Sequence, residues 1–151
     1  MSMPDSIDEH LVRLLGQDAR QSSETLAKQL KLSSATVRRR LRKLIRDELI
    51  HIVGVVDPAK FGFPVSVVIT LDVTHEKLES AIEALAKRPE IRWVSTTTGR
   101  FDIIALARLR SNNHLSEFIT KVLSQLKGVR DSETFLCLGV EKGRYIQFIP
   151  P

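Results

Sequence analysis

Residues 31–46, with the sequence KLSSATVRRRLRKLIR, hold the strongest structural signal in the N-terminal half of the chain. Apolar residues recur at positions 37, 41, 44 and 45, a spacing of i, i+4, i+7 and i+8 that predicts one amphipathic helix. Ser33 or Ser34 is suited to begin it, because a serine oxygen accepts a free backbone N–H of the first turn. The segment contains no Asp or Glu and seven cations: Lys31, Arg38, Arg39, Arg40, Arg42, Lys43 and Arg46.

The cations gather on the outer face of this helix. At about 100° per residue, a buried Val37 places Arg39 nearly opposite. A small polar first turn and a basic outer face suit the major groove of DNA, where hydroxyls and guanidinium groups reach base edges and other cations neutralise phosphates. A solvated basic face is the alternative interpretation. The predicted DNA-binding residues are Ser33, Ser34, Ala35, Thr36, Arg38, Arg39, Arg40, Arg42 and Lys43, of which Arg40, like Arg46, lies near the core edge and is equally suited to a structural ion pair.

Two further helices precede this one. Ser6 and Glu9 have the spacing of a capping box, so we expect a helix from Ser6 to about Gly16. Ser22 is suited to cap a second helix, and only three or four residues separate that helix from the basic one. Two helices joined by so short a turn form a helix-turn-helix unit, which favours the DNA-binding interpretation. The inward residues expected for these two helices are Ile7, Leu11, Leu14, Leu15, Leu26, Ala27 and Leu30.

The segment after the basic helix marks a change of domain. Residues 49–56, LIHIVGVV, are rich in β-branched residues and predict one or two short strands, which would make the helix-turn-helix winged. Asp57-Pro58 and the stretch 61–64, FGFP, indicate turns. We therefore predict a helix-turn-helix DNA-binding domain over residues 1–50, a strand and hinge linker over 51–63, and a ligand-binding and oligomerisation domain over 64–151.

The second half alternates between strand and helix patterns. Strands are predicted over 65–73, 91–98, 101–109 and 133–140, with a possible last strand over 145–149. Gly99-Arg100 joins the second and third strands as a hairpin. Helices are expected after Thr74 and after a cap at Asn113. The order βαββαβ is that of a ferredoxin-like domain. The predicted fold is therefore α+β, a winged helix-turn-helix followed by a ferredoxin-like βαββαβ domain.

Several of these strands are apolar on both faces. In the strand from Phe101, Ile103 and Ala105 alternate with Ile104 and Leu106, so neither face is polar. Both helices of a ferredoxin-like domain cover the same face, and an apolar second face needs another cover. We therefore predict a homodimer through the open sheet face, which would present two basic helices to a pseudo-palindromic site in double-stranded DNA.

The whole chain resembles the Lrp/AsnC family, named after the leucine-responsive and asparagine regulators. Each matching segment is weak by itself, but their order and spacing are fairly specific. The segments are Ile7-Asp8 with Leu11, Leu14 and Leu15; Leu26-Ala27 with Leu30; Leu32 to Val37 with Arg40, Leu41 and Leu44; Asp57-Pro58; Thr98 to Asp102; and Gly128-Val129 with Thr134. The resemblance implies a transcription factor that binds amino acids and assembles dimers into octamers or similar rings.

The resemblance also places an effector site at the loop Gly99, Arg100, Phe101 and Asp102, with Thr134 as a further candidate. An amino acid needs donors for its carboxylate and an acceptor for its ammonium group, which the backbone near Gly99, Arg100 and Asp102 can supply. Arg100 stands where the family often has an acidic or small residue, so its charge departs from the usual pattern. The alternative is a tight turn in which Asp102 accepts local backbone N–H groups.

The remaining composition excludes other classes of protein. With 42% hydrophobic and 27% charged residues and a net charge of +5, the chain is typical of a folded globular protein. The single cysteine excludes an internal disulfide and favours a cytoplasmic protein, and no stretch predicts a membrane span. No cofactor, metal or catalytic motif is expected. The alternatives are an enzyme like the sirohaem decarboxylases, which share this architecture, and an amino-acid-binding module with a vestigial helix-turn-helix.

Overall fold

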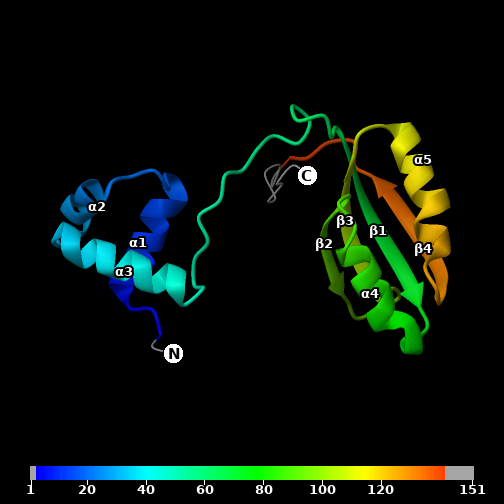
Figure 1. Cartoon of the computed structure of the whole chain (residues 1–151), viewed down its shortest axis with the longest axis horizontal. Coiled ribbons are helices and arrows are strands. Elements are labelled where there is room, and N and C mark those ends of the chain that lie inside the picture. Colours follow the sequence, from blue (N-terminus) through cyan, green and yellow to red (C-terminus); the bar gives the residue numbers. More distant parts are fainter. Residues whose placement is uncertain (1–2, 142–151) are drawn as a thin grey trace. The chain divides into compact units, whose positions relative to one another are not determined.

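The computed structural model describes residues 3–141 and divides the chain into two compact units, Met1–Val53 and Gly54–Pro151 (Figure 1). Each unit has a hydrophobic core of its own. The finer division into residues 1–50, 51–63 and 64–151 stays a prediction.

The first unit consists, over its described residues, of three α-helices: α1 (Ser6–Gln17), α2 (Ser23–Leu30) and α3 (Ser34–Arg46). Both predicted serine caps at the second and third helices are present. Ser22 Oγ accepts the Thr25 N–H and Ser33 Oγ accepts the Thr36 N–H, each over 3.1 Å. Three residues separate α2 from α3, and the first of them, Lys31, has a φ of 54°. The core consists of Leu11, Leu14, Leu26, Ala27, Val37 and Leu44.

The cap of α1 lies one residue earlier than predicted. Asp5, rather than Ser6, precedes the helix, and its Oδ1 accepts the N–H groups of Ile7 and Asp8. Asp8 returns a bond to the Asp5 N–H, which completes a capping box. The pair Asp5 and Asp8 has the same spacing as Ser6 and Glu9, and a carboxylate accepts two donors more strongly than a hydroxyl does.

The predicted wing is not formed. Residues 50–57, all of them described, contain no strand, although the chain is rich in β-branched residues there. The backbone leaves α3 through Glu48, which has a φ of 55°, and the N–H groups of Leu49 and Ile50 bond back to the Leu44 carbonyl. A strand needs a neighbouring backbone for its ladder, and the described chain offers none to this segment.

The second unit confirms the βαββαβ order. Its described elements are β1 (Val65–Val73), a short 3-10 turn (His75–Lys77), α4 (Leu78–Ala86), β2 (Ile91–Thr96), β3 (Ile103–Leu109), α5 (Asn112–Lys121), a second 3-10 turn (Leu123–Gln125) and β4 (Val129–Leu136). The strands form an antiparallel sheet in the order β2-β3-β1-β4. Alternate residues of β1 and β3 pack with Ala81, Leu85 and Phe118, so α4 and α5 cover the same face of the sheet (Figure 1).

Several element ends in this unit differ from the prediction. β2 ends at Thr96 rather than at 98, and β3 begins at Ile103 rather than at 101. Ser111 rather than Asn113 caps α5, by accepting the His114 N–H. β4 covers 129–136 rather than 133–140, because it pairs with β1 from Val73 to Val67. Thr74 precedes the 3-10 turn without a side-chain cap bond. The possible strand over 145–149 lies outside the described residues.

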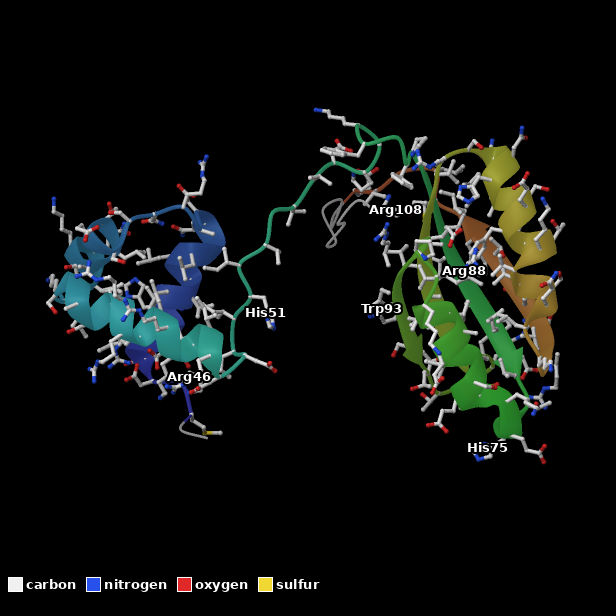
Figure 2. The ribbon with its side chains drawn as sticks, viewed as in Figure 1. Arg46, His51, His75, Arg88, Trp93 and Arg108 are labelled. Atoms are coloured by element: carbon white, nitrogen blue, oxygen red, sulfur yellow. The ribbon has the colours of Figure 1, made fainter. Side chains whose placement is uncertain are left out.

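The second face of the sheet is apolar at its centre, as predicted. Trp93, labelled in Figure 2, pairs with Leu106 across β2 and β3, and Val68 pairs with Phe135 across β1 and β4. These positions alternate with the core residues of β1 and β3, so they lie on the face away from the helices. Trp93 is 49% exposed and Phe135 50% exposed. Together with Ile104, these residues are called the open face below. Among the described residues, no helix is both long and apolar enough to cross a membrane.

Candidate functional site

The basic helix α3 uses some of its cations to hold the fold and leaves others unpaired. Arg38 Nη1 lies 3.0 Å from Glu24 Oε1 on α2, and Arg46 Nε lies 2.9 Å from Asp47 Oδ1. Arg40 pairs with two carboxylates of the first helix and its cap. Among residues 3–141, the side chains of the other cations of the segment form no ion pair or hydrogen bond: Lys31, Arg39, Arg42 and Lys43.

The unpaired cations of α3, Arg39, Arg42 and Lys43, lie on the side of the helix away from its buried residues. Val37 and Leu44 are buried, whereas Arg39 and Arg42 are exposed and Lys43 is half-buried. The exposed residues predicted to contact DNA are Ser33, Ala35, Arg38, Arg39 and Arg42, and the half-buried ones are Ser34, Thr36, Arg40 and Lys43. The structure therefore gives this helix a surface that is rich in positive charge, on which Arg39, Arg42 and Lys43 form no ion pair with a carboxylate of residues 3–141.

The N-terminal turn of α3 is fixed by its cap. Besides accepting the Thr36 N–H, Ser33 Oγ lies 2.8 Å from Thr36 Oγ1. The other backbone N–H groups of the first turn carry the positive end of the helix dipole, which favours a phosphate oxygen. Ser33 thus has a structural role in the free protein, and Ala35, whose side chain is exposed, leaves the turn open to a close approach.

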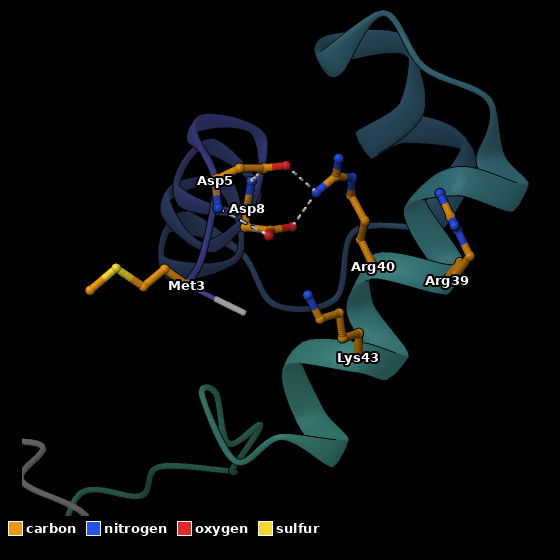
Figure 3. Close-up of a pocket in the computed structure, with 6 residues that line it drawn as sticks. All are labelled: Met3, Asp5, Asp8, Arg39, Arg40 and Lys43. Carbon is orange, nitrogen blue, oxygen red and sulfur yellow. Dashed lines mark hydrogen bonds and ion pairs between the residues drawn. The ribbon is translucent and has the colours of Figure 1, made fainter. Parts of the chain in front are cut away.

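Arg40 differs from its neighbours because it is tied to α1. Its Nη1 lies 2.8 Å from Asp8 Oδ1 and 2.8 Å from Asp5 Oδ2, and the Asp8 side chain is 6% exposed (Figure 3). The hydrogen bonds that Arg40 donates to the carboxylates of Asp8 and then Asp5 raise the pKa of Arg40. The geometry favours the structural alternative for Arg40. Arg39 and Lys43 line the same hollow, a cavity of about 270 Å³ beside this ion pair.

The predicted effector loop is a tight, internally bonded hairpin. Gly99 has a φ of 114°, which favours glycine. The Thr97 N–H donates to the Asp102 carbonyl, and the Thr97 hydroxyl donates to the Phe101 carbonyl over 2.8 Å. Asp102 Oδ2 accepts the Val73 N–H over 2.8 Å. This carboxylate thus joins the loop to β1, which supports the turn alternative for Asp102.

Arg100 faces acidic residues of β4 that the sequence reasoning missed. Its Nη2 lies 3.1 Å from Glu133 Oε1 and 3.5 Å from Asp131 Oδ2, and its guanidinium carbon lies 4.9 Å from the centre of the Phe101 ring. The two acids alternate along β4, so a strand pattern could have placed them on one face. Thr134 pairs with Ile69 and therefore points to the helix-covered face, the opposite side of β4 from Glu133.

Comparison with known proteins decides which family has this pair of units. A family model described as the AsnC-type helix-turn-helix domain matches residues 5–45, and one described as the Lrp/AsnC ligand binding domain matches residues 66–146. The chain belongs to the Lrp/AsnC family. This result confirms the resemblance found in the sequence, and it identifies an Lrp/AsnC transcriptional regulator with a ligand-binding domain.

Individual Lrp/AsnC relatives extend over nearly the whole chain. A helix-turn-helix transcriptional regulator of Pyrococcus abyssi is 31% identical over 142 residues, 93% of this chain and 90% of the relative. One of Pyrococcus furiosus is 29% identical over 144 residues, 95% and 97% of the two chains. These relatives are regulators, and the prediction that the chain is not an enzyme is confirmed against the sirohaem-decarboxylase alternative.

Solved structures of the Lrp/AsnC family have the same fold. Escherichia coli AsnC superimposes with a TM-score of 0.86 at 23% identity, over 93% of this chain and 95% of AsnC. A transcriptional regulator of Neisseria meningitidis, solved in complex with L-methionine, has a TM-score of 0.86 at 21% identity, over 93% and 94% of the two chains.

Within residues 3–141, no group of three or more His, Cys, Asp or Glu side chains could hold a metal ion.

Proposed function

We propose that this Lrp/AsnC regulator binds double-stranded DNA through α3, with Arg39, Arg42 and Lys43 as the principal cations. Their lack of a carboxylate partner within residues 3–141 is the observation that supports the proposal. Cations that are not committed to the fold can neutralise phosphates or donate to guanine in the major groove without first breaking an ion pair. Ser34, Ala35, Thr36 and Arg38 complete the contact surface, whereas Arg40 and Ser33 hold its shape. We propose that the protein binds this DNA in the cytoplasm.

A salt titration with a random-sequence duplex tests the phosphate contacts. We expect Arg39→Ala combined with Arg42→Ala to weaken binding. The negative slope of log K against log salt should become shallower by roughly 0.9 for each phosphate that is no longer neutralised. Arg20→Ala is the matched control, because Arg20 is also exposed and pairs with its near neighbour Asp18. An unchanged affinity and slope in the double variant would refute the role of α3.

Selection from a random pool then separates base contacts from phosphate contacts. A residue that reads a base changes the recovered sequence when it is replaced, whereas a phosphate contact weakens all sequences alike. Recovery of a pseudo-palindromic sequence by the unchanged protein would support a two-fold dimer on DNA. Loss of the preferred base at one position in Arg39→Ala or Arg42→Ala would identify the side chain that reads it.

For the second unit, we infer that an amino acid binds at the hairpin 99–102 and changes how dimers associate into octamers or similar rings. Arg100 supports this site, because it is a 71% exposed cation that can exchange a β4 carboxylate for a ligand carboxylate. Glu133, 37% exposed, is then free to accept the ligand ammonium group. The L-methionine found with the Neisseria regulator makes methionine the first compound to test.

Thermal unfolding with each of the twenty amino acids tests the effector. A compound that binds the folded protein raises its melting temperature in a concentration-dependent way. We expect Arg100→Ala to abolish that rise and Lys121→Ala, which removes an exposed cation of α5, to preserve it. Light scattering with and without the active compound measures the assembly. If no amino acid changes melting, assembly or DNA affinity, the effector proposal fails while the DNA proposal stands.

A further inference from the structure

Three neighbouring strands place a row of polar side chains at one end of the sheet. Arg108 of β3 pairs with Ser66 of β1, and the Cys137 N–H continues the register of β4 by donating to the Ser66 carbonyl over 2.9 Å. Arg108 and Ser66 alternate with the core residues of their strands, so they lie on the same face as Phe135, away from α4 and α5 (Figure 2 labels Arg108). A guanidinium, a hydroxyl and a thiol therefore occupy adjacent positions.

Arg108 is a buried cation that forms no ion pair within the described chain. It is 7% exposed, and Ser66 is 4% exposed. Within residues 3–141, neither the Arg108 guanidinium nor the Ser66 hydroxyl forms a hydrogen bond, and Arg108 forms no ion pair. Burial lowers the pKa of Arg108, and the nearby Cys137 and Asp57 offset part of this effect. By contrast, Arg100 and Arg130 on the same unit each contact a carboxylate.

A cavity of about 280 Å³ opens onto this row. One wall is the segment before β1, where Asp57 Oδ1 accepts the Ala59 N–H over 3.0 Å and two prolines, Pro58 and Pro64, stiffen the backbone. The opposite wall is the chain after β4, residues 138–140. A volume of this size holds a molecule of a few heavy atoms, at the small end of ligand pockets.

We propose that this cavity binds a small monocarboxylate, with Arg108 donating to both carboxylate oxygens and Ser66 Oγ donating to one of them. An unpaired buried cation is costly, and an anion that completes its hydrogen bonds relieves that cost. Asp57, on the cavity wall, repels a second carboxylate and so disfavours dicarboxylates. The site shares no residue with the hairpin 99–102, so it can succeed or fail independently of the proposed effector site.

Cys137 supplies the measurement, because it is the chain's single cysteine and lines the cavity. The rate of alkylation by iodoacetamide, a neutral reagent, is followed by mass spectrometry on the full chain. We expect sodium propionate to slow the reaction in a saturable way and propionamide, its uncharged isostere, to leave the rate unchanged at equal concentration. Succinate is expected to protect less than propionate.

Variants separate the carboxylate site from simple crowding. Arg108→Met is expected to weaken propionate protection at least about tenfold, since charge-assisted hydrogen bonds are removed. Lys127→Met removes an exposed cation of the same unit and should retain protection. Should Arg108→Met not fold, Arg108→Lys keeps the charge but lacks the planar fork, and Ser66→Ala removes the second donor; each is expected to weaken propionate protection.

Three results would overturn the proposal. Equal protection by propionate and propionamide would show that the cavity does not recognise charge. Undiminished protection in a folded Arg108→Met or Arg108→Lys variant would remove the arginine from the site. Alkylation that slows with protein concentration, and does not respond to propionate, would assign the cavity to contact with a second copy of the chain.

Discussion

Arg40 on α3 donates through Nη1 to Oδ1 of Asp8 on α1 over 2.8 Å, in a site where the Asp8 side chain is almost fully buried. The contact holds the turn of α3 that contains Arg40 against α1. Arg39 and Lys43 flank this anchored residue, and their cations are left for a ligand (Figure 3). One arginine of the cluster therefore positions α3, and its neighbours give α3 its available charge.

Breaking this ion pair should destabilise the first unit. Asp8→Ala removes the buried partner of Arg40 and one bond of the α1 capping box, so we expect a loss of about 2 kcal/mol in the free energy of unfolding. Urea unfolding followed by circular dichroism at the helix band measures it. Arg40→Met, alone and combined with Asp8→Ala, completes a double-mutant cycle, and strictly additive losses would show that the two side chains do not couple.

Acid should weaken the same unit. The Asp8 backbone N–H, and then Arg40, hold the pKa of Asp5 below its ordinary value of 3.8. A carboxylate whose pKa is lowered by folding contributes stability above its unfolded pKa, and that stability is lost as the pH falls through the folded pKa. We expect the urea concentration at the unfolding midpoint to decrease as the pH is lowered below about 4. In Asp5→Asn, the dependence of this midpoint on pH should be weaker in the same range. An unaltered profile in Asp5→Asn would contradict the assignment.

Gly128 should tolerate no side chain. Its φ is 85°, and an added Cβ would collide with the Lys77 side chain and with Thr74 Oγ1. Gly62 has the same φ, but no atom lies within 4 Å of its Cβ position. We expect Gly128→Ala to cost about 3 kcal/mol and Gly62→Ala about 1 kcal/mol, because both strain the backbone and only the first adds the collision. Fluorescence of Trp93 during urea unfolding reports both, and equal losses would refute the steric explanation.

The open face should hold a dimer together. A charge on this face would have to lose water on association, so we expect Phe135→Glu, on the edge strand β4, to shift the protein to monomers in light scattering at micromolar concentration. Ile119→Glu is the matched control: Ile119 lies on α5 and is 37% exposed, but it is outside the open face. A dimer that persists in Phe135→Glu would place the interface elsewhere.

The sequence was informative where structure depends on local periodicity. The i, i+4, i+7 pattern located α3 and limited its cap to Ser33 or Ser34, of which Ser33 is the cap, and alternation located the strands that became β1 and β3. Local patterns failed where two candidates had equal spacing. Asp5 displaced Ser6 as a cap because a carboxylate accepts two backbone donors, and Ser111 displaced Asn113 for no reason that spacing could reveal.

Contacts between residues distant in sequence were beyond such reasoning. The partners of Arg40 lie 35 and 32 residues away, so the pattern of α3 left its role open between DNA and an ion pair. Arg100 likewise meets Glu133 through the pairing of the sheet, which a loop motif does not contain. The absence of a wing has the same origin, since a strand-forming sequence at 49–56 specifies no neighbour to pair with.

The separate hydrophobic cores of the two units bear on how this regulator loses its structure. One core is built from α1, α2 and α3 and the other from the sheet with α4 and α5, and no residue belongs to both. Denaturation is then the sum of two cooperative events, each with its own midpoint and its own denaturant dependence. A single melting temperature would average them. Comparing circular dichroism, which reports the helices of both units, with the emission of Trp93, which reports the second unit alone, would resolve a partly denatured species with one unit intact.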